Sequence, residues 1–455
     1  SVSIGGIPAT ITTPNNSSYI VVRVNPGPTT RSQAVSDVVI IGSNGVSTRE
    51  VGAFTYSVID SITPSSGQGG TLVTLAGIGL LGSYPGQTIT SLKVAGVSVS
   101  SIVSSSNTSI VAKLQALSNS IDQTGGLLVT LQNGQTVQGI SGEAGENIVE
   151  FTYKVAGSIT SVTPSQGQFG SVVVIRGTEL LGYGASLVNA TLAGVPVDSV
   201  VFANATYAKV IAGSHVNATS VGSVVLYSNT GAEVVRSSGW QYVEAGAVAS
   251  VSPSSGQEGT RVTIGGSNLL SGSTGLSSVT IDGINVESIV SANNSQVVVV
   301  VAVRASSALG TTIVLRSSDG AAVTLGGGFN YTTPGAISTV TPATGQIGTI
   351  VEIRGSNLRG SGSSVVQVLL ATVSAQILSE NDTHVVVKAA SGADGLSGDV
   401  VVLADTGARS TKASAWTYLV ASIISSVTPS QGQYGSIVTI RGQRLFGGGS
   451  SITQV

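Results

Sequence analysis

The sequence predicts an all-β protein made of tandem β-sandwiches of about ninety residues each. A sixteen-residue stretch that returns along the chain, an aromatic pair that recurs at the same period, and short Val-rich segments separated by glycine-rich turns predict this together. Self-similarity at a fixed period is typical of chains built from one repeated structural unit. We therefore expect several copies of one small domain in a row.

The recurring stretch sets the period. VTPSQGQFGSVVVIRG, residues 162–177, returns as VTPSQGQYGSIVTIRG, residues 427–442, and three weaker copies occur at 62–77, 251–266 and 340–355. The prolines of the five copies, spaced 100, 89, 89 and 87 residues apart, are Pro64, Pro164, Pro253, Pro342 and Pro429. We expect each proline to start the first strand after a bend. We also expect the glycines equivalent to Gly67 and Gly70 to permit turns that another residue would strain.

A glutamine recurs within this stretch, and two interpretations of it stay open. The five glutamines are Gln68, Gln168, Gln257, Gln346 and Gln433. In one interpretation the side chain hydrogen-bonds a loop of the neighbouring unit and fixes the angle between domains. In the other it is a polar turn residue with no further role.

An aromatic-x-Tyr triplet closes each unit. The pairs are Phe54/Tyr56, Phe151/Tyr153, Trp240/Tyr242, Phe329/Tyr331 and Trp416/Tyr418. Because residues two apart in a strand point to the same face, both aromatic rings are expected in the core. The next proline follows the tyrosine by eight to eleven residues, so the linkers are short.

Between these landmarks the sequence predicts about seven short antiparallel strands, as in residues 158–242. The segments alternate with period two and end at Gly, Asn or Pro, which is typical of a β-sandwich. Tight turns requiring positive φ are predicted before each closing strand. Their sequences are SNG at 43–45, QNG at 132–134, NTG at 229–231, SDG at 318–320 and DTG at 405–407.

The composition excludes several classes of protein. Charged residues make up 9% of the chain and the formal net charge is -2, so the positive field that nucleic-acid binding requires is missing. The apolar runs, such as 172–175 and 297–303, are far shorter than the roughly 20 residues of a spanning helix. The chain has no cysteine, which leaves the redox compartment open. It begins with Ser1, which favours a processed product or a piece of a longer protein.

The pattern P-x-x-G-x-x-G-x-x-V-x-I-x-G, followed by a leucine and a closing F-x-Y, resembles the IPT/TIG domain. This resemblance implies a linear array of immunoglobulin-like sandwiches, and the family occurs in receptors, transcription factors, accessory modules of starch-acting enzymes and long surface proteins. The missing basic loops disfavour the transcription-factor type. The expected parts are 1–58 (C-terminal part of a module), four modules at 59–156, 157–245, 246–334 and 335–421, and 422–455 (N-terminal part of a module).

No catalytic constellation is present in the sequence, and the chain is expected not to be an enzyme. His215 and His384 lie in different units, and Tyr207, Gln296 and Ile110 are expected to stand where His384 stands in its unit. The motifs of hydrolases, zinc proteases, P-loops and EF-hands are missing. We expect no catalytic residue, metal site or cofactor other than covalent glycans.

N-glycosylation sequons recur in what the alignment predicts to be one register, opening the same turn before a strand. They are Asn16, Asn107, Asn204, Asn293 and Asn381. Four further sequons are interpreted as accidents of a Ser/Thr-rich chain, at Asn15, Asn189, Asn217 and Asn330. The alternative is that asparagine is simply a good turn residue. Sugars at the five register positions would solvate a surface that is poor in charge.

Residues 2–24 align with 279–301, and residues 450–455 align with 363–368. Two interpretations follow: a window from a longer array, or a subunit whose C-terminal half completes the N-terminal half of the next. We expect a structural subunit of an extracellular or cell-surface glycosylated fibre, a homo-oligomer or continuous array running end to end, with lateral self-association also open. Nucleic acid is not expected as a partner, and no membrane span is expected in this segment. The alternative is the stalk of an adhesin or receptor, and a carbohydrate-binding array is disfavoured by 4% aromatic residues.

Overall fold

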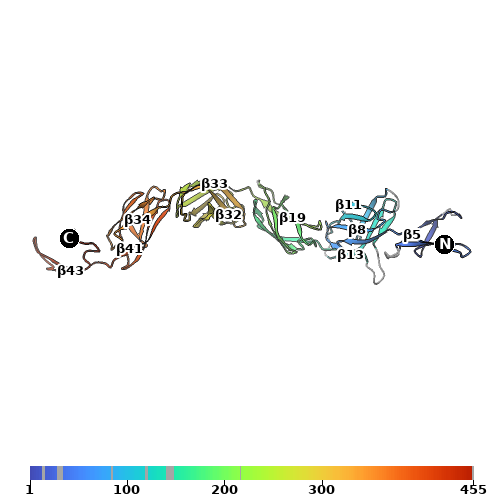
Figure 1. The fold of residues 1–455 in the computed structure, drawn as a ribbon, viewed down its shortest axis with the longest axis horizontal. Coiled ribbons are helices and arrows are strands. Elements are labelled where there is room, and N and C mark those ends of the chain that lie inside the picture. The colour runs from blue at the N-terminus through green and yellow to red at the C-terminus, as the bar shows by residue number, and fades with distance from the viewer. Residues whose placement is uncertain are drawn as a thin grey trace. The chain divides into compact units, whose positions relative to one another are not determined.

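The structure is a computed structural model that describes residues 1–12, 16–27, 34–82, 86–117, 121–139, 148–215 and 217–452. All of its regular elements are strands, numbered β1 to β43 along the chain (Figure 1). The chain divides into two compact units, residues 1–242 and 243–455, and each is described by itself. The all-β prediction is confirmed.

Module 157–245 of the first unit shows the architecture. One sheet has the order β16-β18-β22-β21 and the other the order β17-β24-β23-β19-β20. The strands are β16 (Ser158–Thr163), β17 (Gln166–Gly167), β18 (Val172–Thr178), β19 (Leu187–Leu192), β20 (Val195–Pro196), β21 (Ser199–Ala203), β22 (Tyr207–Ile211), β23 (Gly222–Ser228) and β24 (Glu233–Tyr242). Alternate residues such as Val173 and Ile175 on β18 point inward and are fully buried. The two sheets enclose one apolar core, as the period-two pattern predicted.

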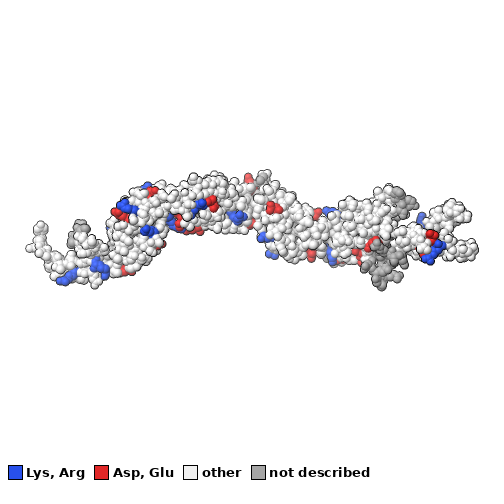
Figure 2. All heavy atoms as spheres, viewed as in Figure 1, with Lys and Arg blue, Asp and Glu red and all other residues white. Residues whose placement is uncertain are grey.

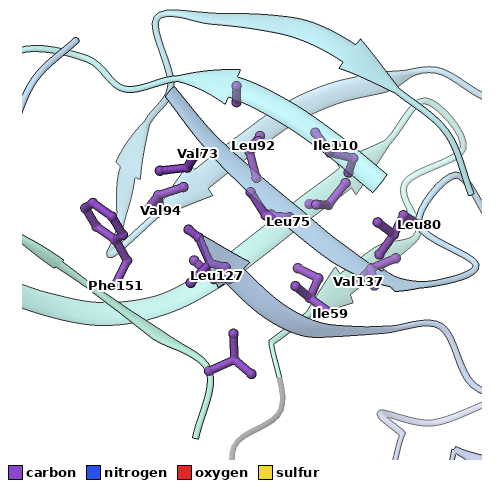
Figure 3. Packing of buried hydrophobic residues seen from close by; sticks show 14 of the residues in the cluster. Ile59, Val73, Leu75, Leu80, Leu92, Val94, Ile110, Leu127, Val137 and Phe151 are labelled. Atoms are coloured by element: carbon purple, nitrogen blue, oxygen red, sulfur yellow. The ribbon is translucent and has the colours of Figure 1, made fainter. Parts of the chain in front are cut away.

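Module 59–156 repeats this arrangement, with sheet orders β11-β12-β8-β6 and β10-β9-β13-β15-β7, the latter with β14 added on β13. Its strands are β6 (Val58–Thr63), β7 (Ser66–Gly67), β8 (Leu72–Ile78), β9 (Ile89–Val94), β10 (Val97–Ser98), β11 (Ser101–Ser105), β12 (Ser109–Lys113), β13 (Gln123–Leu131), β14 (Thr136–Gln138) and β15 (Glu150–Tyr153). Figure 3 shows Leu75, Leu92 and Phe151 among the side chains of the core between these sheets.

In the second unit, module 246–334 has sheet orders β25-β27-β31-β30 and β26-β33-β32-β28-β29. Its strands are β25 (Ala247–Ser252), β26 (Ser255–Gly256), β27 (Arg261–Ser267), β28 (Leu276–Ile281), β29 (Ile284–Asn285), β30 (Ser288–Ala292), β31 (Gln296–Val300), β32 (Ala308–Ser317) and β33 (Ala322–Tyr331). This is the strand order of module 157–245, strand for strand.

Module 335–421 joins both sheets into one strand path, β34-β36-β39-β38-β37-β40-β41-β35, because β38 pairs with strands of both. Its strands are β34 (Ala336–Thr341), β35 (Thr344–Gly345), β36 (Ile350–Ser356), β37 (Val365–Leu370), β38 (Val373–Glu380), β39 (His384–Lys388), β40 (Ser397–Ala404) and β41 (Arg409–Tyr418). The extra length of β38 replaces two separate strands of the other modules.

The two end segments hold parts of the same pattern. The strands described within residues 1–58 form a sheet of order β3-β2-β1-β4-β5, and β42 pairs with β43 near the other end. The strands are β1 (Val2–Ile4), β2 (Ile7–Thr12), β3 (Val21–Arg23), β4 (Val35–Ile41), β5 (Ser47–Thr55), β42 (Ile423–Thr428) and β43 (Thr439–Gln443). Val438 and Ile440 are 45% and 38% exposed, whereas the equivalent Val173 and Ile175 are fully buried.

Two details of the strand prediction are wrong. The first strand precedes the signature proline: β16 ends at Thr163, and the Thr163-Pro164 peptide bond is cis. Because proline lacks an N–H and cannot continue the ladder, it ends a strand here instead of starting one. The sheets are also not wholly antiparallel, since the two-residue strand β17 pairs in parallel with the closing strand β24.

The closing aromatic pairs of the four modules and the turns behave as predicted, whereas Phe54 of the first segment is only half-buried. Phe151, Tyr153, Trp240 and Tyr242 are fully buried, and the rings of each pair meet edge to face with centroids 5.2 and 5.7 Å apart. The glycine of each predicted tight turn has a positive φ, for example +85° at Gly231. On the visible face, charged side chains are sparse and scattered (Figure 2).

Candidate functional site at the module junctions

The repeated glutamine lies buried at the boundary between consecutive modules. Gln68 is 1% exposed, so both ends of its amide need hydrogen-bond partners inside the protein. Its Oε1 accepts the backbone N–H of Gly157 at 2.6 Å, and its Nε2 donates to the carbonyl of Glu233 at 3.0 Å. Gly157 is in the linker and Glu233 begins strand β24, so one side chain binds the linker and the body of the next module.

The same junction recurs in the second unit. Gln257, 2% exposed, accepts the N–H of Gly335 at 2.5 Å and donates to the carbonyl of Arg409 at 3.0 Å. At the following boundary, the Oε1 of Gln346 accepts the N–H of Ser422 at 2.8 Å. The prediction that the glutamine forms a hydrogen bond with the neighbouring module is confirmed at these three junctions. Gln433, by contrast, is exposed.

The tight turn of one module rests on the opening loop of the module before it. The N–H of Leu72 donates to the carbonyl of Thr230 at 2.7 Å, and the N–H of Arg261 donates to that of Thr406 at 2.8 Å. These contacts join the GQxG stretch to the NTG or DTG turn. Sequence reasoning predicted both loops but missed their contact, because a main-chain contact leaves no direct signal in one sequence.

Glycine is required at this contact by close approach as well as by conformation. Gly259 has a φ of +82°, and a Cβ there would lie 2.6 Å from the carbonyl oxygen of Gly407 in the next module. Within one module, Gly67 serves differently: its Cβ would lie 2.6 Å from Oγ1 of Thr71. The predicted turn role therefore holds for Gly70, with a φ of +86°, while Gly67 is kept by crowding.

Ion pairs flank two of these junctions with opposite polarity. Lys113 of module 59–156 lies 3.2 Å from Glu233 of the next module. Arg409 reaches back to Glu258 at 2.9 Å and Glu287 at 2.6 Å in module 246–334. The hydrogen bond from Arg409 to Glu287 is the largest cause that raises the pKa of this arginine, followed by its bond to Glu258 against opposing desolvation. The pair residues are one-third to two-fifths exposed, so each bond adds little stability.

Three of the predicted sequon asparagines occupy one hairpin position. Asn204, Asn293 and Asn381 are exposed and stand at the turn between two strands. The Oδ1 of Asn204 accepts the N–H of Thr206 at 2.9 Å and of Tyr207 at 2.8 Å, and the other two make the same bonds at 2.8 to 2.9 Å. Asn16 makes the equivalent bonds in the first segment. The arrangement holds Oδ1 in the turn.

Asn107 is out of this register, and the predicted five-fold register is wrong at that position. In this turn the N–H of Ser106 donates to the carbonyl of Ser109, so Ser106 stands at the position that asparagine occupies in the other modules. Ser106 Oγ accepts the turn N–H groups, and Asn107 stands one residue later, with its Oδ1 accepting the N–H of Leu81. Thr108 is therefore the structural equivalent of Thr206. The predicted alignment was displaced by one residue because serines and asparagine follow one another at this turn.

The other sequons are scattered. Asn189 lies within β19 and Asn330 within β33, where its Oδ1 accepts the N–H of Gly310 at 2.7 Å. Asn217 is exposed in a bend. Asn15 lies outside the described residues. These contacts do not show whether a sugar is attached, so glycosylation stays a prediction at every sequon.

The sequence matches the IPT/TIG domain family over residues 57–153, 247–331 and 336–418, more than half of the chain. The chain belongs to the IPT/TIG domain family. The IPT/TIG match leaves out module 157–245, which nevertheless has the strand order of module 246–334. No curated protein sequence matches the chain.

Several solved structures resemble the IPT/TIG chain, at low identity and low TM-score. The plexin A4 extracellular region matches at 15% identity and a TM-score of 0.39, over 84% of this chain and 40% of that one. SGBP-B of a mixed-linkage glucan utilization locus of Bacteroides ovatus matches at 15% identity and a TM-score of 0.19, over 60% of this chain and 66% of that one. The cell adhesion molecule DSCAM matches at 9% and 0.18, over 92% and 56%. The chain thus spans less than half the length of the plexin chain.

The histidines of these IPT/TIG modules lie apart. His384 Nε2 is 3.6 Å from Glu352 on the neighbouring strand, and His215 packs against the ring of Tyr242. Within the described ranges, no group of three or more His, Asp or Glu side chains is placed to hold a metal ion. Among the same residues, no helix has the length and hydropathy to cross a membrane.

Proposed function

We propose that this chain is a structural array of an extracellular or cell-surface protein, in which IPT/TIG modules are held in series by buried-glutamine junctions. The observation that carries the proposal is the recurrence of one junction: Gln68 and Gln257 each bond a linker glycine and a closing strand of the next module. A buried, doubly bonded side chain restricts rotation about a short linker. A fibre and the stalk of an adhesin both need restricted rotation between their modules. The proposed role is structural and includes no catalytic step.

The experiment measures the spread of distances across a junction. The chain has no cysteine, so spin labels can be attached at introduced cysteines alone, for example at the exposed positions Val290 and Leu378 in adjacent modules. Pulsed electron resonance on the full chain should give a narrow distance distribution, which broadens when Gln257→Ala is added. A broad distribution in the unsubstituted chain would contradict a semi-rigid array. Electron micrographs of native material would then separate a fibre from a stalk that ends in a head.

The array is proposed to continue through the end segments. The exposed faces of Val438 and Ile440 are apolar where a complete module buries them, and residues 1–58 supply strands of the missing kind. We expect strands equivalent to those of residues 1–58, from a neighbouring copy or a longer chain, to complete this sandwich. Fusing a second copy of residues 1–58 after Val455 should slow amide exchange in β43. Unchanged exchange would argue against completion.

N-glycosylation of the hairpin asparagines belongs to the same proposal. Asn16, Asn204, Asn293 and Asn381 are exposed at equivalent turns, and sugar there would solvate a surface with few charges. Asn107 is included as an exposed turn residue, although it is displaced by one position. Glycopeptide mass spectrometry of the chain secreted from eukaryotic cells should find these sites more fully occupied than Asn189 and Asn330. The reverse order would favour the simple turn role.

A further inference from the structure

One hairpin carries an aromatic pair beside its sequon, with one ring exposed and the other half-buried. Phe202 on β21 is 52% exposed, and its ring centroid lies 6.0 Å from that of Tyr207 on β22. The guanidinium carbon of Arg176 lies 5.2 Å from the centroid of Tyr207. In module 246–334 the equivalent hairpin has Ser291 and Gln296 instead. Because moving apolar surface out of water is favourable, the aromatic rings beside Asn204 provide a surface on which an apolar face of a ligand can pack.

The strand register places these groups on one face. Ala203 pairs with Ala208, which is fully buried, so the neighbouring pair of Phe202 and Lys209 points outward. Asn204 and Tyr207, the next pair toward the tip, share this outer face because the N–H of Asn204 bonds the carbonyl of Tyr207. Phe202, Asn204 and Tyr207 therefore lie together at the hairpin tip.

The contacts of Asn204 leave one atom for attachment. Its Oδ1 accepts the N–H and the hydroxyl of Thr206 and the N–H of Tyr207. All of these bonds go to the oxygen, so the turn orients Nδ2 away from them. In N-glycosylation, Nδ2 forms a bond to C1 of an activated sugar donor, the diphosphate leaving group departs, and one amide proton is lost, without oxidation or reduction.

We propose that Phe202 and Tyr207 form a stacking platform for the first sugar of a glycan on Asn204. The inference rests on the proposed glycosylation and deepens it, since it gives the sugar a binding surface on the protein. A pyranose ring has an apolar face of C–H groups, and packing that face on an aromatic ring removes apolar surface of both from water. Arg176 packs on the ring of Tyr207, which helps to hold the platform in place.

The test is a four-state cycle on the full chain. Unsubstituted chain and Phe202→Ser are each prepared with sugar, by secretion from eukaryotic cells, and without sugar, from bacterial cytoplasm. The substitution copies the natural residue of the hairpin at Ser291. Hydrogen exchange of the β22 amides reports local opening, and Asn293 provides an internal control hairpin without aromatic residues. Comparing sugared with bare protein avoids any change to Asn204, whose Oδ1 closes the turn.

We expect sugar to slow exchange in β22 about 3- to 10-fold more in the unsubstituted chain than in Phe202→Ser, the range for aromatic contacts of ordinary strength. The hairpin of Asn293 should show no such dependence. Phe202→Trp should keep the effect and Phe202→Leu should lose it, so the result does not depend on one variant folding well.

Three outcomes would overturn the proposal, and each leads to a different conclusion about this hairpin. Sugar on Asn204 with equal slowing in both chains rejects the platform but leaves the proposed glycosylation intact. An unmodified Asn204 in the secreted chain rejects both. Self-association of the bare chain that Phe202→Ser abolishes, seen by analytical ultracentrifugation, would make the surface an interface between copies instead.

Discussion

Glu233 and Arg409 occupy the same position in their modules, the first residue of the closing strand, and carry opposite charges. Each bonds the preceding glutamine through its carbonyl group and pairs its side chain with the preceding module. The backbone contact is thus shared by both junctions, whereas the side-chain contact distinguishes them.

The ion pairs should therefore affect junction choice more than stability. Arg409→Glu places a third carboxylate beside Glu258 and Glu287 and should lower the free energy of unfolding by about 1 kcal/mol, mostly at low salt. Lys113→Glu combined with Glu233→Lys should recover most of the loss caused by either change alone. Urea unfolding at low and high ionic strength measures both effects. Equal effects at the two salt concentrations would show that the loss is not electrostatic.

Removing the glutamine amide should cost more. Gln257→Ala leaves the N–H of Gly335 and the carbonyl of Arg409 without their partner in a buried place, at about 1 to 3 kcal/mol for each unsatisfied group. Urea unfolding and hydrogen exchange at Gly335 would measure the loss. Gln433→Ala is the matched control because this equivalent residue is exposed, and it should leave stability unchanged. A similar effect of both substitutions would place the cost within the loop, not at the junction.

Glycine variants separate strain from crowding at the junction. Gly259 and Gly283 have φ values of +82° and +76°, but a Cβ at Gly283 meets nothing within 4 Å. Gly283→Ala should show the conformational cost alone, roughly 1 kcal/mol. Gly259→Ala should cost clearly more because the new Cβ meets the backbone of the next module. The midpoint temperatures of thermal unfolding of the two variants are compared. Equal decreases would mean that the contacting loops of the two modules move apart at no cost in stability.

Stability should fall at alkaline pH because of the closing tyrosines. Burial raises the pKa of Tyr153 and of Tyr242 to about 12 from 10. The folded protein then binds more protons than the unfolded chain between these values, so stability is complete below pH 10 and is lost as pH rises toward 12. Each group contributes up to about 3 kcal/mol.

Urea unfolding from pH 8 to 12 measures this loss. Tyr153→Phe should flatten the pH dependence of module 59–156. Tyr434→Phe serves as the control because this side chain is fully exposed. A pH dependence that persists in Tyr153→Phe would assign the alkaline loss to other groups.

The sequence was most informative where the chain repeats. Pairs such as Trp240/Tyr242 were predicted to be buried because period-two alternation fixes the face of a strand, and the turn at Gly231 was predicted because its chemistry is local. The position of Pro164 was missed because a β-propensity pattern does not say on which side of a proline the strand lies. The register of Asn107 was missed for a related reason: Ser106 performs the role of asparagine in the turn, and similar polar residues make the alignment ambiguous by one position.

The junction was predictable only in part. A glutamine that recurs without chemistry of its own suggested a contact between modules, and this is what Gln68 and Gln257 make. Their partners could not be deduced, since the atoms they bond are main-chain groups that every residue possesses. The loop-to-turn contact of Leu72 with Thr230 was hidden in the same way.

Because the glutamine junction binds main-chain peptide groups, it places almost no demand on the identity of the residues that it binds. Beyond a few glycines that allow close approach, a following module needs only the right backbone path to be accepted. Gene duplication or loss of a whole module would then leave compatible neighbours on both sides, without compensating substitutions. The array can accordingly change length over evolutionary time while the surfaces of its modules diverge, so that length and surface chemistry are free to be selected independently.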